Sequence, residues 1–197
     1  PKIIGIVPHN MIFLFFPIFS FSQELIKCND SINYIVKNFD TENYAIEIKG
    51  NIEQLKNPKV FLLNNITIIQ LLTNETKDYT KYGNDELSIM ASYVMSEGEY
   101  FSGAFKKKVD LAIIPENLSD TKKAIFWHFS LPENTTSTSN NEIKALKSVF
   151  ITSVKNDKII TIATTQFENQ KLENIEKFLV DLTKTIELKN NKEFCKK

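Results

Sequence analysis

The sequence predicts an α+β domain in which an antiparallel sheet carries two helices. Most of the chain is a succession of short runs rich in β-branched and aromatic residues, with turn-forming residues between them. Consecutive strands without intervening helices favour an antiparallel sheet. Two stretches, residues 31–39 and 172–188, instead place apolar residues at helical spacing. We therefore expect residues 23–197 to form one α+β domain with two main helices packed on its sheet.

The clearest sheet signal is a hairpin near the C-terminal end. Two β-branched runs, residues 149–154 and 159–165, are separated by KNDK. Asn and Asp tolerate the positive φ of a tight turn, so Asn156-Asp157 is the expected loop. This turn pairs Val154 with Ile159 and Ile151 with Ile162. One face of the hairpin is then nearly all aliphatic: Val149, Ile151, Ile160 and Ile162. We expect that face to pack on the core.

The stretch that follows predicts the C-terminal helix. Asn169 is the expected N-cap. One apolar stripe runs along the helix: Leu172, Ile175, Phe178, Leu179, Leu182 and Ile186. Charged residues fill the opposite face, as in a helix that covers a sheet. We expect this helix to lie across the aliphatic face of the hairpin.

The first half of the chain predicts the other helix and several strands. Ile32, Ile35, Val36 and Phe39 recur at helical spacing after Asp30, which predicts a helix over residues 31–39. The remaining predictions follow in chain order: a strand at 44–49, a hairpin of 59–63 with 66–72 around Asn64-Asn65, a strand at 86–96, a strand at 109–114 ended by Pro115, a strand at 124–131 ended by Pro132, a polar loop at 135–141 and a short helical turn at 141–147.

Aromatic residues gather in and near a glycine-containing stretch. Residues 97–105 contain Gly98 and Gly103, which predicts a hinged loop carrying Tyr100, Phe101 and Phe105. With Trp127 from the strand at 124–131, these side chains are the candidate ligand-binding residues. The alternative interpretation is that the same aromatic residues cap one edge of the core.

An apolar run near the start of the chain predicts an export signal. Residues 11–21 (MIFLFFPIFSF) are uncharged, have the length of a signal-peptide core and are too short to span a bilayer. Ser20 and Ser22 put small residues where a signal peptidase reads. We expect residues 1–22 to be removed, leaving a periplasmic or secreted chain that begins at Gln23 and has no membrane span. The alternative is a buried core strand in the same place.

The chain has two cysteines, and the sequence allows them to be either disulfide-bonded or free. Cys28 and Cys195 lie near the two ends of the predicted mature domain. In an oxidising compartment they could form a disulfide that joins the termini. The alternative is a pair of free thiols in mobile tails. Neither has another Cys or His at metal-ligand spacing, so we expect no metal site.

Composition and motifs narrow the possible functions. The chain balances 24 basic against 24 acidic residues and contains no arginine, the usual residue for bidentate phosphate and base contacts. We therefore expect no nucleic-acid binding. His128 is the one histidine of the predicted mature chain, and no nucleophile elbow, P-loop or dinucleotide fingerprint accompanies it. We expect no catalytic residue and no cofactor.

The element order of the C-terminal half resembles a known family. Residues 147–167 (KSVFITSVKNDKIITIATTQF) and 172–188 (LENIEKFLVDLTKTIEL) give a strand, a hairpin and an amphipathic helix in succession. Over residues 124–188 this order resembles the PsbP-like α/β sandwich family. The resemblance implies an antiparallel sheet with helices on its faces. It assigns no functional residue.

These observations predict an exported, non-catalytic accessory domain that binds another envelope protein. One alternative is a carrier of a small apolar ligand or lipid, held by Tyr100, Phe101, Phe105 and Trp127. A second alternative is a hydrolase that uses His128 as its general base.

Overall fold

The computed structural model describes residues 23–28, 32–38, 43–56, 59–64, 67–133, 143–189 and 194–195. The predicted signal segment at 1–22 and the predicted polar loop at 135–141 lie outside the described residues.

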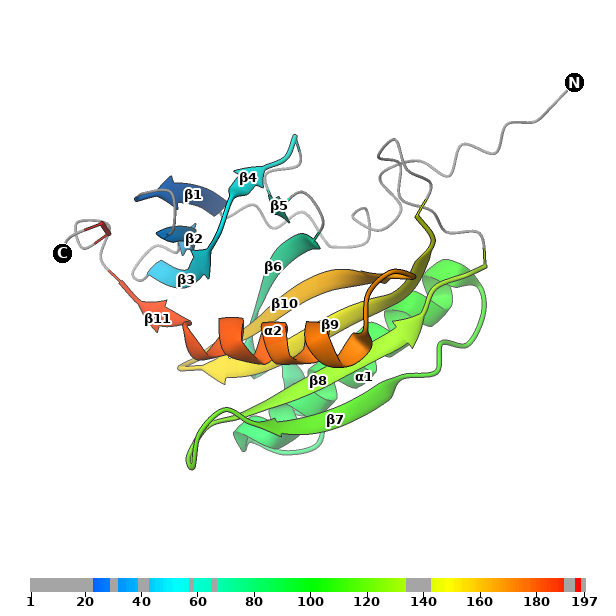
Figure 1. The fold of residues 1–197 in the computed structure, drawn as a ribbon. Helices are drawn as coiled ribbons and strands as arrows, with labels where there is room; N and C mark the ends of the chain where they lie inside the picture. Colours follow the sequence, from blue (N-terminus) through cyan, green and yellow to red (C-terminus); the bar gives the residue numbers. More distant parts are fainter. Residues whose placement is uncertain are drawn as a thin grey trace, which may run out of the picture.

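The described residues form two antiparallel sheets and two α-helices (Figure 1). The larger sheet has the strand order β4-β5-β6-β10-β9-β8-β7, and the smaller has the order β1-β2-β3-β11. The strands are β1 (Gln23–Lys27), β2 (Ile32–Asn38), β3 (Asn43–Lys49), β4 (Ile52–Gln54), β5 (Val60–Leu63), β6 (Thr67–Glu75), β7 (Ala112–Asn117), β8 (Lys123–Ser130), β9 (Ala145–Lys155), β10 (Lys158–Phe167) and β11 (Glu187–Leu188). The helices are η1 (Thr76–Tyr79), α1 (Glu86–Phe105) and α2 (Leu172–Lys184). The predicted α+β class with an antiparallel sheet and two main helices is confirmed.

The hairpin of β9 and β10 forms the middle of the larger sheet, in the predicted register. Val154 pairs with Ile159 and Ile151 pairs with Ile162. Asn156 has a φ of 55°, the left-handed conformation that a tight turn requires. The hairpin prediction is confirmed, and β6 and β8 extend the sheet on either side of it.

The two helices cover opposite faces of the larger sheet (Figure 1). On one face the aliphatic residues of the hairpin share a core with the buried stripe of α2 and with β3 of the smaller sheet. On the other face Phe150, Ile159 and Ala163 pack with residues of α1. The predicted position of the C-terminal helix is confirmed, although its N-cap is Lys171 and not Asn169. Its predicted end at residue 188 is wrong: α2 ends at Lys184, because Glu187 and Leu188 pair with β3 as strand β11.

The predicted helix at 31–39 is wrong, because residues 32–38 form strand β2. This strand lies between β1 and β3 and is buried on both faces. Ile35 belongs to the core beneath α2, whereas Tyr34 and Val36 pack on the outer side with Phe194. Apolar residues are needed on both faces of such a strand, and this removes the simple alternation that identifies a half-buried strand.

The predicted strand at 86–96 and the predicted loop at 97–105 are also wrong, because together they form helix α1. Asp85 caps the helix by accepting a hydrogen bond from the backbone N–H of Ser88, at 3.1 Å. The apparent alternation arises because α1 buries a broad face, which includes Ile89, Met90, Tyr93, Val94 and Phe101. Gly98 lies inside the helix, where a Cβ atom would come within 2.6 Å of the side chain of Leu111. The glycine permits close packing here and does not hinge a loop.

Most of the shorter predictions need only changes of boundary. The strand at 44–49 and the hairpin of 59–63 with 66–72 appear as β3, β5 and β6. The strand at 124–131 appears as β8, and the strand at 109–114 appears as β7. Pro115 lies inside β7 and does not end it. The helical turn predicted at 141–147 is wrong for residues 145–147, because strand β9 begins at Ala145.

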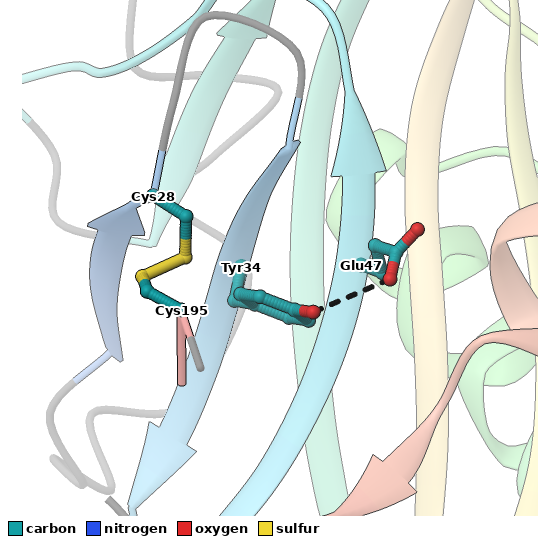
Figure 2. The surroundings of a disulfide bond; sticks show 4 residues. All are labelled: Cys28, Tyr34, Glu47 and Cys195. Atoms are coloured by element: carbon teal, nitrogen blue, oxygen red, sulfur yellow. Dashed lines mark hydrogen bonds between the residues drawn. A yellow bond between two sulfur atoms is a disulfide. The ribbon is translucent and has the colours of Figure 1, made fainter. Parts of the chain in front are cut away.

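The two ends of the described chain are joined by a disulfide between Cys28 and Cys195 (Figure 2). The side chain of the neighbouring Phe194 packs at 5.2 Å between ring centroids from Tyr34 on the outer face of the smaller sheet. Lys189 places its Nζ atom 4.3 Å from the centroid of the same tyrosine ring. The hydroxyl of Tyr34 donates to Glu47 at 3.3 Å (Figure 2). The bond therefore holds the C-terminal segment over the smaller sheet.

Replacing Cys28 and Cys195 together by serine should lower the free energy of unfolding by about 2–5 kcal/mol, because a cross-link over a separation of 167 residues no longer restricts the unfolded chain. Urea unfolding under oxidising conditions measures the change. The wild-type chain in reducing buffer should match the double variant. Equal stability of the variant and the oxidised wild type would show that Phe194 and Lys189 hold the segment without the bond.

Candidate functional site

The open edge of the larger sheet exposes two adjacent isoleucines. Strand β7 ends the strand order and pairs, among the described strands, only with β8 (Figure 1). Ile113 is 41% exposed and Ile114 is 38% exposed. They point to opposite faces, because Ile113 pairs with Trp127 on the α1 side and Ile114 pairs with Phe126 on the α2 side.

The hydrogen-bond register determines which backbone groups of β7 point outward. Leu118 donates its N–H to the carbonyl oxygen of Lys122 at 2.9 Å, just beyond the end of the strand pair. Residues of an antiparallel pair alternate between bonded and non-bonded positions. Ile113, Pro115 and Asn117 therefore direct their backbone groups away from β8. Proline has no N–H to offer, and an outward position on an edge strand is where it is tolerated.

Two carboxyl groups lie beside this edge on its α2 side. Glu116 of β7 pairs with Ala124, which belongs to the core beneath α2, so its side chain lies on the same side as Glu176 of α2. Burial raises the pKa of Glu176, and hydrogen bonding to Glu116 and repulsion from Glu116 and Glu173 raise it further. Among the described residues, no group of three or more His, Cys, Asp or Glu side chains is arranged to hold a metal ion.

Three of the four predicted ligand-binding residues meet in an aromatic cluster beneath α1. Phe101 contacts Phe129 and Phe150, with ring centroids 4.7 and 5.9 Å apart. Trp127 stacks on Phe150 with centroids 4.0 Å apart, and Phe105 lies 6.1 Å from Phe129.

The fourth residue, Tyr100, lies at the border of this cluster: its ring centroid is 5.8 Å from that of Phe101, and the residue is 44% exposed. Trp127 is fully buried, and Phe101 is nearly so. Neither ring presents a free surface in this structure, although the ligand-binding role remains a prediction.

A line of polar groups crosses the sheet beneath α1. The indole N–H of Trp127 donates to the hydroxyl of Thr152 at 2.9 Å, and this hydroxyl is hydrogen-bonded to that of Thr161, also at 2.9 Å. Both threonines are fully buried. The buried hydroxyl of Tyr93 faces the sheet near Thr161, which acts to lower the pKa of that tyrosine, whereas burial and Glu97 raise it well above its usual value. These hydrogen bonds satisfy the indole N–H of Trp127, the only tryptophan of the chain, inside a largely apolar layer.

Glu97 is an ionisable group on the core-facing side of α1. It lies one turn after Tyr93 and one turn before Phe101, and both of these side chains are buried. Burial raises the pKa of Glu97 to about 7. Its charge in turn contributes to the raised pKa values of Tyr79, Tyr93 and Tyr100.

Glu97 is not among the predicted site residues, because residues 97–105 were expected to form a loop. The regular four-residue steps Tyr93, Glu97 and Phe101 were the signal that could have found it.

Replacing Glu97 by glutamine should change how stability depends on pH. The folded-state pKa near 7 exceeds the usual value of 4.5, so the wild-type chain loses stability as the pH rises from about 4.5 to 7. At pH 8 the variant should be more stable than the wild type by on the order of 2–3 kcal/mol. At pH 4 the two should be nearly equal. Thermal unfolding measured across this range tests the effect.

The exposed Glu99 on the same helix provides the control. Glu99→Gln should keep the wild-type pH profile. A wild-type stability that is flat between pH 4.5 and 7 would contradict the buried position of Glu97.

His128 lies half-buried on β8. Burial lowers its pKa, and the nearby Lys147 lowers it further. Its ring contacts that of Phe126 at 6.0 Å between centroids. The described residues supply it with no hydrogen-bond or ion-pair partner. The hydrolase alternative remains a prediction, and the described residues give its proposed general base, His128, no hydrogen-bonding partner.

Comparison with known proteins finds a similarity to a solved structure. No family model matches the chain, and no curated protein matches it in sequence. The chain resembles the solution structure of cyanobacterial PsbP (CyanoP) from Synechocystis sp. PCC 6803. The TM-score is 0.45 at 9% sequence identity, over 88% of this chain and 96% of that chain.

The described helices include none that is both long and apolar enough to cross a bilayer.

Proposed function

We propose that this chain is an exported, non-catalytic accessory domain that binds another protein by adding a strand to the edge of β7. The proposal rests on one observation: β7 lies at the edge of the sheet and also exposes two isoleucines, Ile113 and Ile114. Strand addition uses main-chain hydrogen bonds for affinity and the alternate side chains for specificity.

The other sheet edges offer less to a partner. Strand β4 has three residues, and its Glu53 and Gln54 are exposed and polar. Strand β11 has two residues. Strand β1 carries the exposed Glu24 and Lys27, and the disulfide anchors its end. Proteins protect sheet edges with charges and short strands, and β7 lacks both protections at Ile113 and Ile114.

Export is supported by two independent features. The apolar run at 11–21 is followed by polar sequence from Gln23. The disulfide between Cys28 and Cys195 belongs to a class of bond that persists in oxidising compartments. Both features agree with a domain that works outside the cytosol.

Export predicts a defined N-terminus. The chain recovered from the envelope or medium of cells that express it should have an intact mass that begins at Gln23 and carries one disulfide. A chain recovered with residues 1–22 still attached would contradict removal of the segment as a signal.

Binding at the edge predicts a position-specific cross-link. A photo-reactive amino acid at position 114 should give one discrete adduct in the fraction that contains the processed chain. Ile113→Pro should reduce that adduct about tenfold, because it removes an outward N–H from β7 without touching the bonds to β8. Ile113→Val keeps the N–H and should preserve the adduct.

The matched control for the cross-link is Met95 on α1, which is as exposed as Ile113. A photo-reactive group at position 95 should not give the adduct. The same yield from both positions, or a yield unaffected by Ile113→Pro, would show that the contact does not use the edge.

A further inference from the structure

The carboxyl pair beside β7 is placed where an added strand would pass. Glu116 follows Pro115, and its backbone groups point toward β8. In an antiparallel partner strand, the residue opposite Glu116 would therefore occupy a non-hydrogen-bonded position, where facing side chains approach most closely. That residue would lie on the α2 side, beside Glu176.

Among the residues that the structure describes, the two carboxyl groups have no positive partner within ion-pair distance. None of the ion pairs among the described residues includes Glu116 or Glu176. The two side chains are only half-buried, and Glu173 of the same helix adds a third negative charge nearby. Like charges on neighbouring side chains repel each other. A cationic side chain placed between the carboxyl groups would attract both of them.

Resting on the proposed function, we infer that the partner segment carries two adjacent aliphatic residues, opposite Ile113 and Ile114, and a lysine or arginine opposite Glu116. Ile114 and Glu116 lie on the same face of β7. In an antiparallel partner strand, the basic residue therefore comes two positions before the aliphatic residue that covers Ile114. Ile113 lies on the α1 side and takes the neighbouring aliphatic residue.

A second copy of this chain does not satisfy the pattern through β7. The strand reads AIIPEN and contains no basic residue, so two copies paired along it would bring no cation to Glu116. Their own glutamates would add to the negative charge. Pairing of two copies along β7 is therefore excluded as the arrangement, and the occupant that we infer is a segment of a different protein.

Two blocked six-residue peptides test the inference on the disulfide-bonded chain. The sequence Lys-Thr-Val-Val-Thr-Lys presents the pattern in either strand direction, and Glu-Thr-Val-Val-Thr-Glu is its charge-reversed control. NMR titration to millimolar peptide measures both affinities, and amide hydrogen exchange follows the N–H groups of Ile113 and Asn117. The basic peptide should bind about tenfold more tightly and should slow the exchange of both amides.

The charge preference should depend on the carboxyl pair. Glu116→Gln combined with Glu176→Gln should bring the two peptides to nearly equal affinity. Glu53→Gln, at the opposite edge of the sheet, should leave the preference intact.

The outcomes separate this inference from the proposed function. Equal binding of both peptides to the wild-type chain, with Ile113 and Asn117 protected, would overturn the charge pattern and leave edge binding in place. Binding of the basic peptide without protection of these amides would overturn the inference as non-specific charge attraction. The absence of binding by either peptide would overturn both.

Discussion

The whole arrangement depends on a central hairpin that is apolar on both faces. Strands β9 and β10 bring Ile151 and Ile162 to one side of the larger sheet and Phe150 and Ile159 to the other. Neither face can remain in water without a large hydrophobic cost. Helix α2 and the smaller sheet therefore cover one face, and helix α1 covers the other. Helix α2 needs only a single apolar side for this, which explains why most of its charged residues are exposed.

A line of buried polar groups lies beneath α1. Trp127, Thr152 and Thr161 form a connected line of hydrogen bonds, so their burial costs little. Glu97 differs because burial disfavours its charge, and the fold tolerates the residue in its protonated form near neutral pH. The layer between the sheet and α1 thus combines a line of hydrogen-bonded polar groups on the strands with one carboxyl group, Glu97 on the helix, whose charge opposes folding.

Covering both faces leaves the strand edges as the places where the sheet can still gain contacts. At most edges the strand is short or polar, but β7 combines outward backbone groups with Ile113 and Ile114. Pro115 removes one outward donor and so limits the length over which another strand can pair. The neighbouring Glu116 and Glu176 add a charge requirement. The exposed edge of β7, its two isoleucines and the two carboxyl groups together form a surface that would accept few partner sequences.

Local pattern alone determined the β9–β10 hairpin, its turn at Asn156 and the stripe of α2, because each reflects contacts between residues near in sequence. It failed for β2 and α1, where distant segments decide the structure. Strand β2 is buried on one face by the core beneath α2 and on the other by Phe194. Helix α1 buries a face so broad that its sequence resembles the alternation of a strand. Ile113, Ile114, Glu116 and Glu176 carry no sequence signal as a site. Only the order of strands, which leaves β7 at the end of the sheet and α2 beside it, brings them together.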